Sequence, residues 1–150
     1  MNSKGTVTEN RSHLTAIARK ATSKPMRYLS ASGKLLGRVL DFGCGRGYDA
    51  DAIGCERFDP HYFPSMPDGV FNTIMCNYVF NVIPSLTERD ELIGRFRAYL
   101  APGGIAFISV RNDRSNLNGW TNRGTWQGFI ELDLPIEKSN RNFVMYRLEG

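Results

Sequence analysis

The residues best suited to chemistry lie in one short segment rich in glycine. The run Val39–Gly47 reads VLDFGCGRG, so an apolar strand reaches Asp41 and enters a loop with Gly43, Gly45 and Gly47. Glycine tolerates positive φ and leaves room for a ligand to lie against the backbone. In an open α/β sheet such loops lie at the carboxyl ends of strands, where ligands bind. This segment therefore predicts a ligand-binding loop.

The spacing of the glycines narrows the choice of ligand. Dinucleotide sites favour Gly-x-Gly-x-x-Gly, but here Gly47 falls one residue early and Tyr48 follows it. No lysine follows in the arrangement of a nucleoside triphosphate loop. Asp59 ends the next expected strand, close to the offset of roughly 20 residues at which an acid binds ribose hydroxyls. A turn aspartate before Pro60 is the structural alternative for this residue.

The elements that would position these residues alternate between strand and helix. Helices are expected over about 13–22, 26–32 and 48–53, and from a capping box at Ser85 to about residue 100, before Pro102-Gly103-Gly104. Strands are expected over 38–42, 56–59, 71–77 and 105–110, followed by an antiparallel pair, 125–134 with 143–148. The order predicts an α/β fold with a mostly parallel sheet and a C-terminal antiparallel hairpin.

Length and composition bound the class of protein. The chain has 150 residues, 41% of them hydrophobic, which fits one globular domain over 13–150 after a flexible lead over 1–12. No apolar run approaches the roughly 20 residues of a membrane span, and no signal peptide is recognisable, so a cytoplasmic protein is expected. Three widely spaced cysteines and two histidines form no ligand pattern, so no metal site is expected.

The opening segment is strongly basic, although the net charge of the chain is only +4. Such asymmetry can mark an anionic partner such as nucleic acid, whereas a solvated basic helix is the alternative. Glu9 is the one acidic residue in this segment. The basic residues are Lys4, Arg11, Arg19, Lys20, Lys24, Arg27, Lys34 and Arg38.

Four runs occur in a fixed order between residues 38 and 111: VLDFGCGRG, FDP, FNTIMCNYVFNVI and LAPGGIAFISVR. With these runs the chain resembles the class I S-adenosylmethionine-dependent methyltransferase family. The preceding text TAIARKATSKPMRYL is similar to that of small bacterial and phage-borne methyltransferases, including those that accompany DNA phosphorothioation genes.

The resemblance implies a Rossmann-like methyltransferase fold with S-adenosylmethionine as cofactor. Asp41 would meet the methionine amino group, and Asp59 would bind the ribose. Asn77 and Tyr78 would face the methyl group and the acceptor as the catalytic residues, and Asp68 would take the place of an adenine-contacting acid. The implied cofactor-binding residues are Asp41, Gly43, Cys44, Gly45, Gly47, Asp59 and Asn77.

The chain departs from the family pattern between Asp59 and Phe71. A parallel crossover takes about a dozen residues or more, so the third strand of the family is expected to be reduced or missing. The adenine pocket would then be open, or completed by the N-terminal helix or by a second subunit of a homo-oligomer.

Methyl transfer from a sulfonium is an in-line displacement that depends mainly on positioning, so a dedicated base is optional. Asn77, Tyr78 and Asn81 could hold an acceptor by hydrogen bonds, although Asn81 could equally be a packing group. The Asp/Asn-Pro-Pro-Tyr signature of base-amino methyltransferases is missing, and no Pro-Cys pair could attack a cytosine ring.

Several functional questions stay open from the sequence. The acceptor is a small molecule or a nucleic acid, and the alternatives to methyl transfer are an S-adenosylmethionine lyase and a non-catalytic cofactor- or nucleic-acid-binding module. Arg111 could clamp an anion or lie in a solvent-exposed loop. The loop 116–124, between Trp120 and Trp126, could close over a substrate, or these tryptophans could be core.

Overall fold

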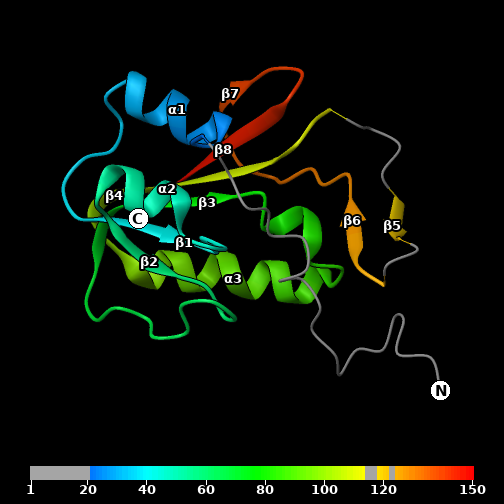
Figure 1. Cartoon of the computed structure of the whole chain (residues 1–150), viewed down its shortest axis with the longest axis horizontal. Coiled ribbons are helices and arrows are strands. Elements are labelled where there is room, and N and C mark those ends of the chain that lie inside the picture. Colours follow the sequence, from blue (N-terminus) through cyan, green and yellow to red (C-terminus); the bar gives the residue numbers. More distant parts are fainter. Residues whose placement is uncertain (1–20, 114–117, 122–123) are drawn as a thin grey trace.

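A six-stranded sheet forms the centre of the computed structural model, which describes residues 21–113, 118–121 and 124–150 (Figure 1). The strand order is β2-β1-β3-β4-β8-β7, with β8 antiparallel to both neighbours and the first four strands parallel. This confirms the predicted fold class. The strands are β1 (Val39–Phe42), β2 (Glu56–Phe58), β3 (Phe71–Asn77), β4 (Leu100–Arg111), β7 (Ile136–Ser139) and β8 (Phe143–Glu149).

Helices cover both faces of the sheet (Figure 1). Successive side chains of a strand point to opposite faces, and β3 shows this directly. Ile74 packs in the cluster that includes Phe96 of α3 (Leu86–Tyr99), whereas Met75 packs in the cluster that includes Leu29 of α1 (Lys24–Ala31). Helix α2 (Tyr48–Ile53) connects β1 to β2. No helix among the described residues has the length and apolar character to cross a membrane.

The helix starts follow local sequence signals. The Ser85 hydroxyl accepts from the Glu88 N–H at 3.1 Å, as the capping box predicts. Ser23 caps α1 in the same way, accepting from the Met26 N–H at 3.3 Å. Pro25 therefore lies in the first turn of a helix, where its missing N–H costs nothing. The expected helix over 13–22 and the lead over 1–12 lie almost entirely outside the described residues.

The sheet ends at β2, as the short interval after Asp59 predicts. Within the described chain, residues 59–70 form no helix or named strand, only an isolated bridge between Asp59 and Phe63. The guanidinium of Arg57 stacks on the Phe63 ring at 4.0 Å, which holds this loop against β2.

Two sequence expectations about β-structure are wrong. Strand β4 begins at Leu100 rather than at 105, and pairs Leu100 with Phe71 before a register shift that accommodates Pro102-Gly103-Gly104. The pairing of 125–134 with 143–148 does not occur. Strand β8 pairs instead with β7, an exposed polar edge strand, while β6 (Trp126–Gly128) pairs with β5 (Asn118–Trp120) in a separate small sheet.

The apolar side chains that suggested a strand over 125–134 have another role. Ile130, Leu132 and Leu134 pack against the core cluster on the α3 face of the sheet from an irregular segment. Their apolar character therefore reflects burial and not sheet pairing.

A buried carboxylate ties α1 to the C-terminal hairpin. The Glu137 side chain is 8% exposed and accepts from the Tyr28 hydroxyl at 2.8 Å. Arg147 and Lys34 lie 3.0 and 3.4 Å from its two oxygens. Burial alone would raise the pKa of Glu137, but the Tyr28 hydrogen bond and the two cations outweigh it, so the pKa lies below its ordinary value of 4.5.

Glu137→Gln is expected to lower the free energy of unfolding at neutral pH by about 1.5–3 kcal/mol, because it weakens charge-assisted hydrogen bonds. A carboxyl with a lowered folded pKa stabilises the fold above its unfolded pKa, and this contribution is lost as the pH falls through the folded pKa. The difference in unfolding free energy between wild type and Glu137→Gln, measured by denaturant unfolding, should therefore shrink below pH 4.5. Glu149→Gln, at an exposed position, is the control. A difference unchanged at low pH would contradict the ion-pair account.

Candidate functional site

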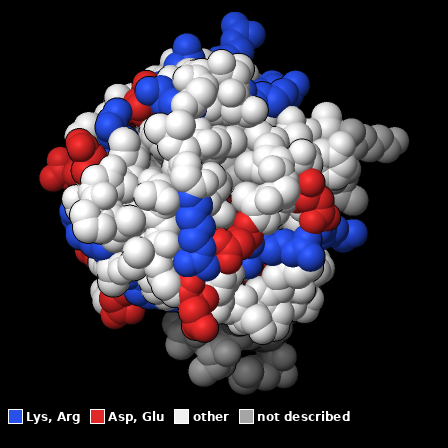
Figure 2. All heavy atoms as spheres, turned by 90° about the vertical axis from the view of Figure 1, so that its left-hand side faces the viewer, with Lys and Arg blue, Asp and Glu red and all other residues white. Residues whose placement is uncertain are grey.

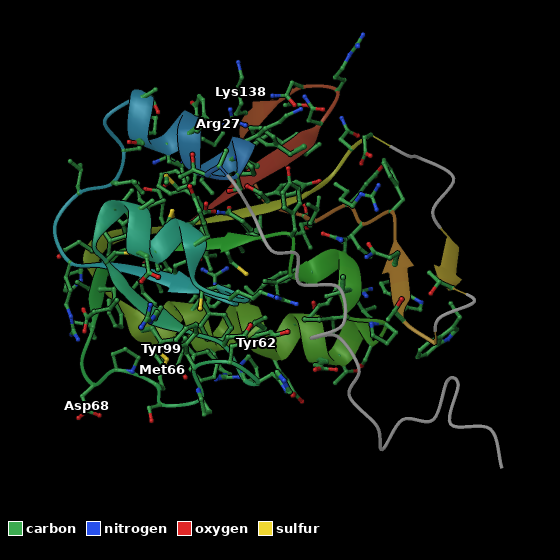
Figure 3. The ribbon with its side chains drawn as sticks, viewed as in Figure 1. Arg27, Tyr62, Met66, Asp68, Tyr99 and Lys138 are labelled. Carbon is green, nitrogen blue, oxygen red and sulfur yellow. The ribbon has the colours of Figure 1, made fainter. Side chains whose placement is uncertain are left out.

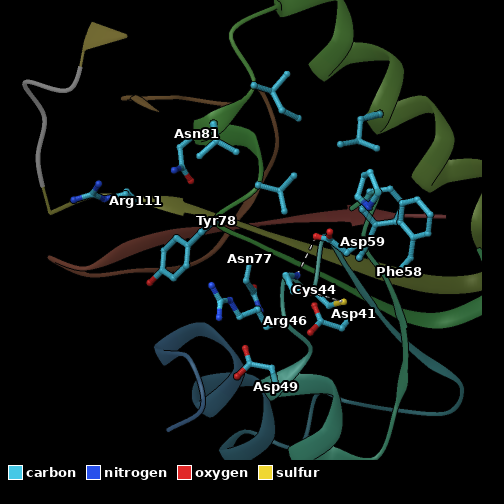
Figure 4. A pocket seen from close by; sticks show the side chains of 18 of the residues that line it. Asp41, Cys44, Arg46, Asp49, Phe58, Asp59, Asn77, Tyr78, Asn81 and Arg111 are labelled. Carbon is cyan, nitrogen blue, oxygen red and sulfur yellow. Dashed lines mark hydrogen bonds between the residues drawn. The ribbon is translucent and has the colours of Figure 1, made fainter. Parts of the chain in front are cut away.

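A cavity of about 1030 Å³ opens at the carboxyl ends of the parallel strands (Figure 4). One side is formed by the glycine loop and the end of β2, the other by the segment that follows β3. Of the residues predicted as catalytic or cofactor-binding, all but Gly47 line it, and Gly47 is the last glycine of the loop and caps α2. Those that line the cavity are Asp41, Gly43, Cys44, Gly45, Asp59, Asn77 and Tyr78.

The glycine loop depends on backbone conformations that other residues rarely adopt. Gly43, Gly45 and Gly47 have φ values of 74°, 57° and 84°. A Cβ on Gly43 would lie 2.3 Å from a methyl carbon of Val79, so the loop lies directly against the segment after β3. The N–H groups of Gly43 and Cys44 donate to the Phe58 carbonyl at 2.7 and 3.1 Å, which fixes the loop to β2.

The two predicted acids lie together beside this loop (Figure 4). Asp41 and Asp59 are 3% and 8% exposed. The Asp59 carboxylate accepts from the Gly45 N–H at 3.1 Å, and from the N–H groups of His61 and Tyr62 at 2.9 Å each. Asp59 is therefore both a turn residue and a cavity residue. Because each oxygen offers two acceptor sites, the oxygen bonded to Gly45 keeps one for a ligand.

The end of β3 carries two further signs of a ligand site. Tyr78 has a φ of 62°, the one positive value at a non-glycine residue among those described, and its N–H donates to the Ser109 carbonyl at 2.8 Å. Strained backbone of this kind collects at functional sites. The side-chain oxygen and nitrogen of Asn77 are both buried without a hydrogen-bond partner. Such groups are costly unless a ligand or water satisfies them.

The sequence reasoning missed several residues that line the cavity. Asp49 of α2 accepts from the backbone N–H and hydroxyl of Ser23, at 2.8 and 2.5 Å, and so holds the start of α1 beside the glycine loop. This contact brings Lys24 and Arg27 to the cavity, where Arg46 also lies. Sequence separation hides the contact, although the cap Ser23 and the first-turn acid Asp49 are both visible as helix-start signals.

Asp68 does not take the role implied for it. It does not line the cavity, and it lies nearer the end of the molecule where the parallel strands begin, whereas Tyr62 lies nearer their carboxyl ends (Figure 3). Its charge helps to raise the pKa of Arg38, after the larger effect of the hydrogen bond to Glu56. The loop runs back along the sheet after Phe63, so a residue this close to β3 cannot reach the site.

A family model for a methyltransferase domain matches residues 13–132. The chain belongs to this methyltransferase domain family. This confirms the family resemblance; the finer likeness to proteins that accompany DNA phosphorothioation genes stays a prediction. No curated protein matches the sequence significantly.

Solved structures show the same fold as this methyltransferase. The Burkholderia thailandensis 1,6-didemethyltoxoflavin-N1-methyltransferase, solved with 1,6-didemethyltoxoflavin and S-adenosylhomocysteine, has a TM-score of 0.60 at 15% identity, covering 95% of this chain and 79% of that one. The N-methyltransferase NodS from Bradyrhizobium japonicum WM9, solved with S-adenosylhomocysteine, has a TM-score of 0.54 at 15% identity, covering 84% of each chain.

The cysteines of the methyltransferase are poor nucleophiles. Burial, with the charges of Asp41 and Asp59, raises the pKa of Cys44 to about 12. Cys76 is buried completely, which raises its pKa well above the ordinary value. Thiolates are the reactive form, so attack by either sulfur is disfavoured. Within the described ranges no cluster of His, Cys, Asp and Glu could hold a metal ion.

Charges on the face where the parallel strands begin do not form one basic patch. The face where the parallel strands begin carries interspersed acidic and basic side chains (Figure 2). Two of the basic residues noted in the sequence are paired there or nearby, Arg38 with Glu56 at 2.6 Å and Lys34 with Glu137 at 3.4 Å. The basic residues 4–20 lie outside the described residues, so the expected nucleic-acid contact through them stays a prediction.

Proposed function

We propose that this methyltransferase moves a methyl group from S-adenosylmethionine to a small-molecule acceptor that occupies the same cavity. The observation that carries the proposal is the continuity of the cavity, which joins Asp41, Asp59 and the glycine loop to Asn77 and Tyr78. Its volume of about 1030 Å³ lies just above the usual range of small-molecule sites, roughly 300–1,000 Å³. A cofactor and a modest acceptor fit such a space together.

The cofactor side offers groups that match S-adenosylmethionine. The Asp41 carboxylate suits the methionine ammonium, and the free acceptor site of Asp59 suits a ribose hydroxyl. Lys24 and Arg27 supply cations for the methionine carboxylate from the start of α1. The loop cannot carry Cβ atoms where it lies, since one on Gly43 would lie 2.3 Å from Val79 and one on Gly47 would lie 3.0 Å from the Phe63 ring. Both solved neighbours above contain S-adenosylhomocysteine, the demethylated product.

Catalysis rests on positioning. S-adenosylmethionine supplies a methyl group that is already activated on a sulfonium. The chain must hold the acceptor atom in line at about 3–3.5 Å and exclude water, which can contribute roughly 7–11 kcal/mol. Asn77 and Tyr78 line the cavity (Figure 4). In this proposal their polar atoms orient the reacting groups. The raised thiol pKa values disfavour a covalent route through Cys44 or Cys76.

Analysis of the products tests this function. We expect purified protein to form S-adenosylhomocysteine from S-adenosylmethionine only when a small-molecule extract is added, with the labelled methyl group recovered in one extract component. A lyase would instead release methylthioadenosine and homoserine lactone without any extract. Methylthioadenosine as the main product, or labelling confined to added nucleic acid, would contradict the proposal.

A further inference from the structure

Buried polar side-chain atoms without a partner are rare in this protein. Among the described residues they belong to Asn77, Asn81 and Ser109. Asn77 is part of the site proposed above, and Ser109 does not line the cavity. Asn81 lines the cavity, is 1% exposed, and keeps its Oδ1 without any hydrogen bond. A buried acceptor left unsatisfied costs stability, so its retention calls for a ligand that satisfies it.

The amide of Asn81 is held in one orientation by a distant part of the chain. Asn81 lies in the short helix η2 (Phe80–Val82), directly after Tyr78 and Val79. Its Nδ2 donates to Oε1 of Gln127 at 3.1 Å, and Gln127 lies in β6 of the small separate sheet. Because the nitrogen is used in this bond, Oδ1 is the group left for the cavity. The amide end of Asn81 points into the cavity near Tyr78 (Figure 4).

The chain on either side of Asn81 is apolar. Val79, Val82 and Ile83 supply apolar wall nearby. Arg111 is drawn on the same side as Asn81 in Figure 4, and its guanidinium binds both carboxylate oxygens of Asp113 at 2.9 and 2.8 Å. A neutralised guanidinium offers little attraction to an anionic acceptor, and an apolar wall opposes a charged one. Asn81 Oδ1 is therefore an unused hydrogen-bond acceptor within an apolar stretch of the lining.

We infer that Asn81 Oδ1, oriented by Gln127, selects the acceptor substrate by accepting a hydrogen bond from it. The acceptor class is a neutral, largely apolar small molecule with an N–H or O–H group near the atom that is methylated. This inference rests on the function proposed above and deepens it. Oδ1 exposes less than 1 Å² without a ligand, so a small shift of neighbouring side chains accompanies contact.

Matched pairs of small ligands test the inference without knowledge of the natural acceptor. Benzimidazole and benzoxazole share one shape, as do indole and benzofuran, but only the first of each pair has an N–H. Binding is measured by ligand-observed NMR titration with S-adenosylhomocysteine at saturation. We expect the wild-type protein to prefer the N–H member of a pair by about five- to tenfold, the effect of one hydrogen bond.

Variants assign this preference to Asn81. Asn81→Leu should abolish it. Asn81→Asp keeps an oxygen acceptor, and the Gln127 amide can turn to donate to the other carboxylate oxygen, so this variant should retain it. Asn142→Leu removes an amide that also lines the cavity but has no unpartnered buried atom, and should leave the preference unchanged. Gln127→Leu, outside the core, should weaken it by freeing the Asn81 amide to rotate.

The outcome separates this inference from the proposed function. S-adenosylhomocysteine affinity should stay within about twofold of wild type in Asn81→Asp and Gln127→Leu. If neither pair shows an N–H preference in the wild type, or if the preference survives Asn81→Leu, the role of Asn81 is wrong while cofactor binding stands. If S-adenosylhomocysteine does not bind the wild type at all, the proposed function fails and the inference fails with it.

Discussion

Asp41→Ala is expected to weaken S-adenosylhomocysteine binding by roughly thirty- to several-thousandfold in a calorimetric titration. Asp41 is 3% exposed and lines the cavity beside the glycine loop, where little water can replace its carboxylate. Removal of one member of a buried charge pair costs about 2–5 kcal/mol, because the ligand ammonium is then buried without its partner. Each 1.4 kcal/mol is about tenfold in affinity, which gives the range above.

Asp51→Ala is the matched control for this experiment. Asp51 lies in the same part of the chain, on α2, but its side chain is 69% exposed and pairs with Arg57 outside the cavity. We expect its affinity for S-adenosylhomocysteine to match that of the wild type. If Asp41→Ala binds as tightly as Asp51→Ala, the placement of the methionine end of the cofactor is wrong.

Asp59→Ala should damage both the fold and the site. The Asp59 carboxylate accepts hydrogen bonds from three backbone N–H groups, in the turn after β2 and in the glycine loop. All three would lose their partner in the variant. Hydrogen bonds to a charged group contribute about 1.5–3 kcal/mol each and are not additive, so we expect a loss of unfolding free energy of at least about 1.5 kcal/mol. Affinity for S-adenosylhomocysteine should fall as well, measured by calorimetry below the unfolding transition.

Asp59→Asn separates the two roles. Asparagine keeps one oxygen, which can still accept from His61 and Tyr62, so most of the turn should survive. Its side-chain nitrogen cannot accept from Gly45, and the acceptor site for a ribose hydroxyl is lost with it. The expected result is a small loss of stability with a clear loss of affinity. Unchanged affinity in both Asp59 variants would show that Asp59 acts only as a turn residue.

The sequence predicted those parts of the molecule whose structure is decided by neighbours along the chain. The bounds of α2 and β3 are those expected, because glycines delimit the helix and an unbroken apolar run forms the buried strand. The glycine loop, Asp41 and Asp59 meet at one edge because the parallel strands β1 and β2 are adjacent, and their order follows from the α/β alternation. The missing strand beyond β2 followed from the short interval between Asp59 and Phe71, compared with the family pattern.

Contacts between distant segments could not be predicted in this way. Strand β7 is polar and lies at an edge, so its sequence Ile136–Ser139 carries no strand signal, and only its pairing with β8 makes it one. The Asn81–Gln127 bond joins residues 46 positions apart. Asn81 belongs to one of the runs that resemble the family, but Gln127 belongs to none, so nothing in the sequence indicated the pairing. Asp68 was placed by its position in a family pattern, whereas the shortened loop carries it away from the site.

The central claim is that one cavity, between the glycine loop and the end of β3, holds the cofactor of this methyltransferase. Calorimetric titration of the wild-type chain with S-adenosylhomocysteine and, separately, with NAD tests it most directly. The account predicts saturable binding of S-adenosylhomocysteine at one site per chain and no binding of NAD. Binding of NAD alone, or of neither compound, would contradict it.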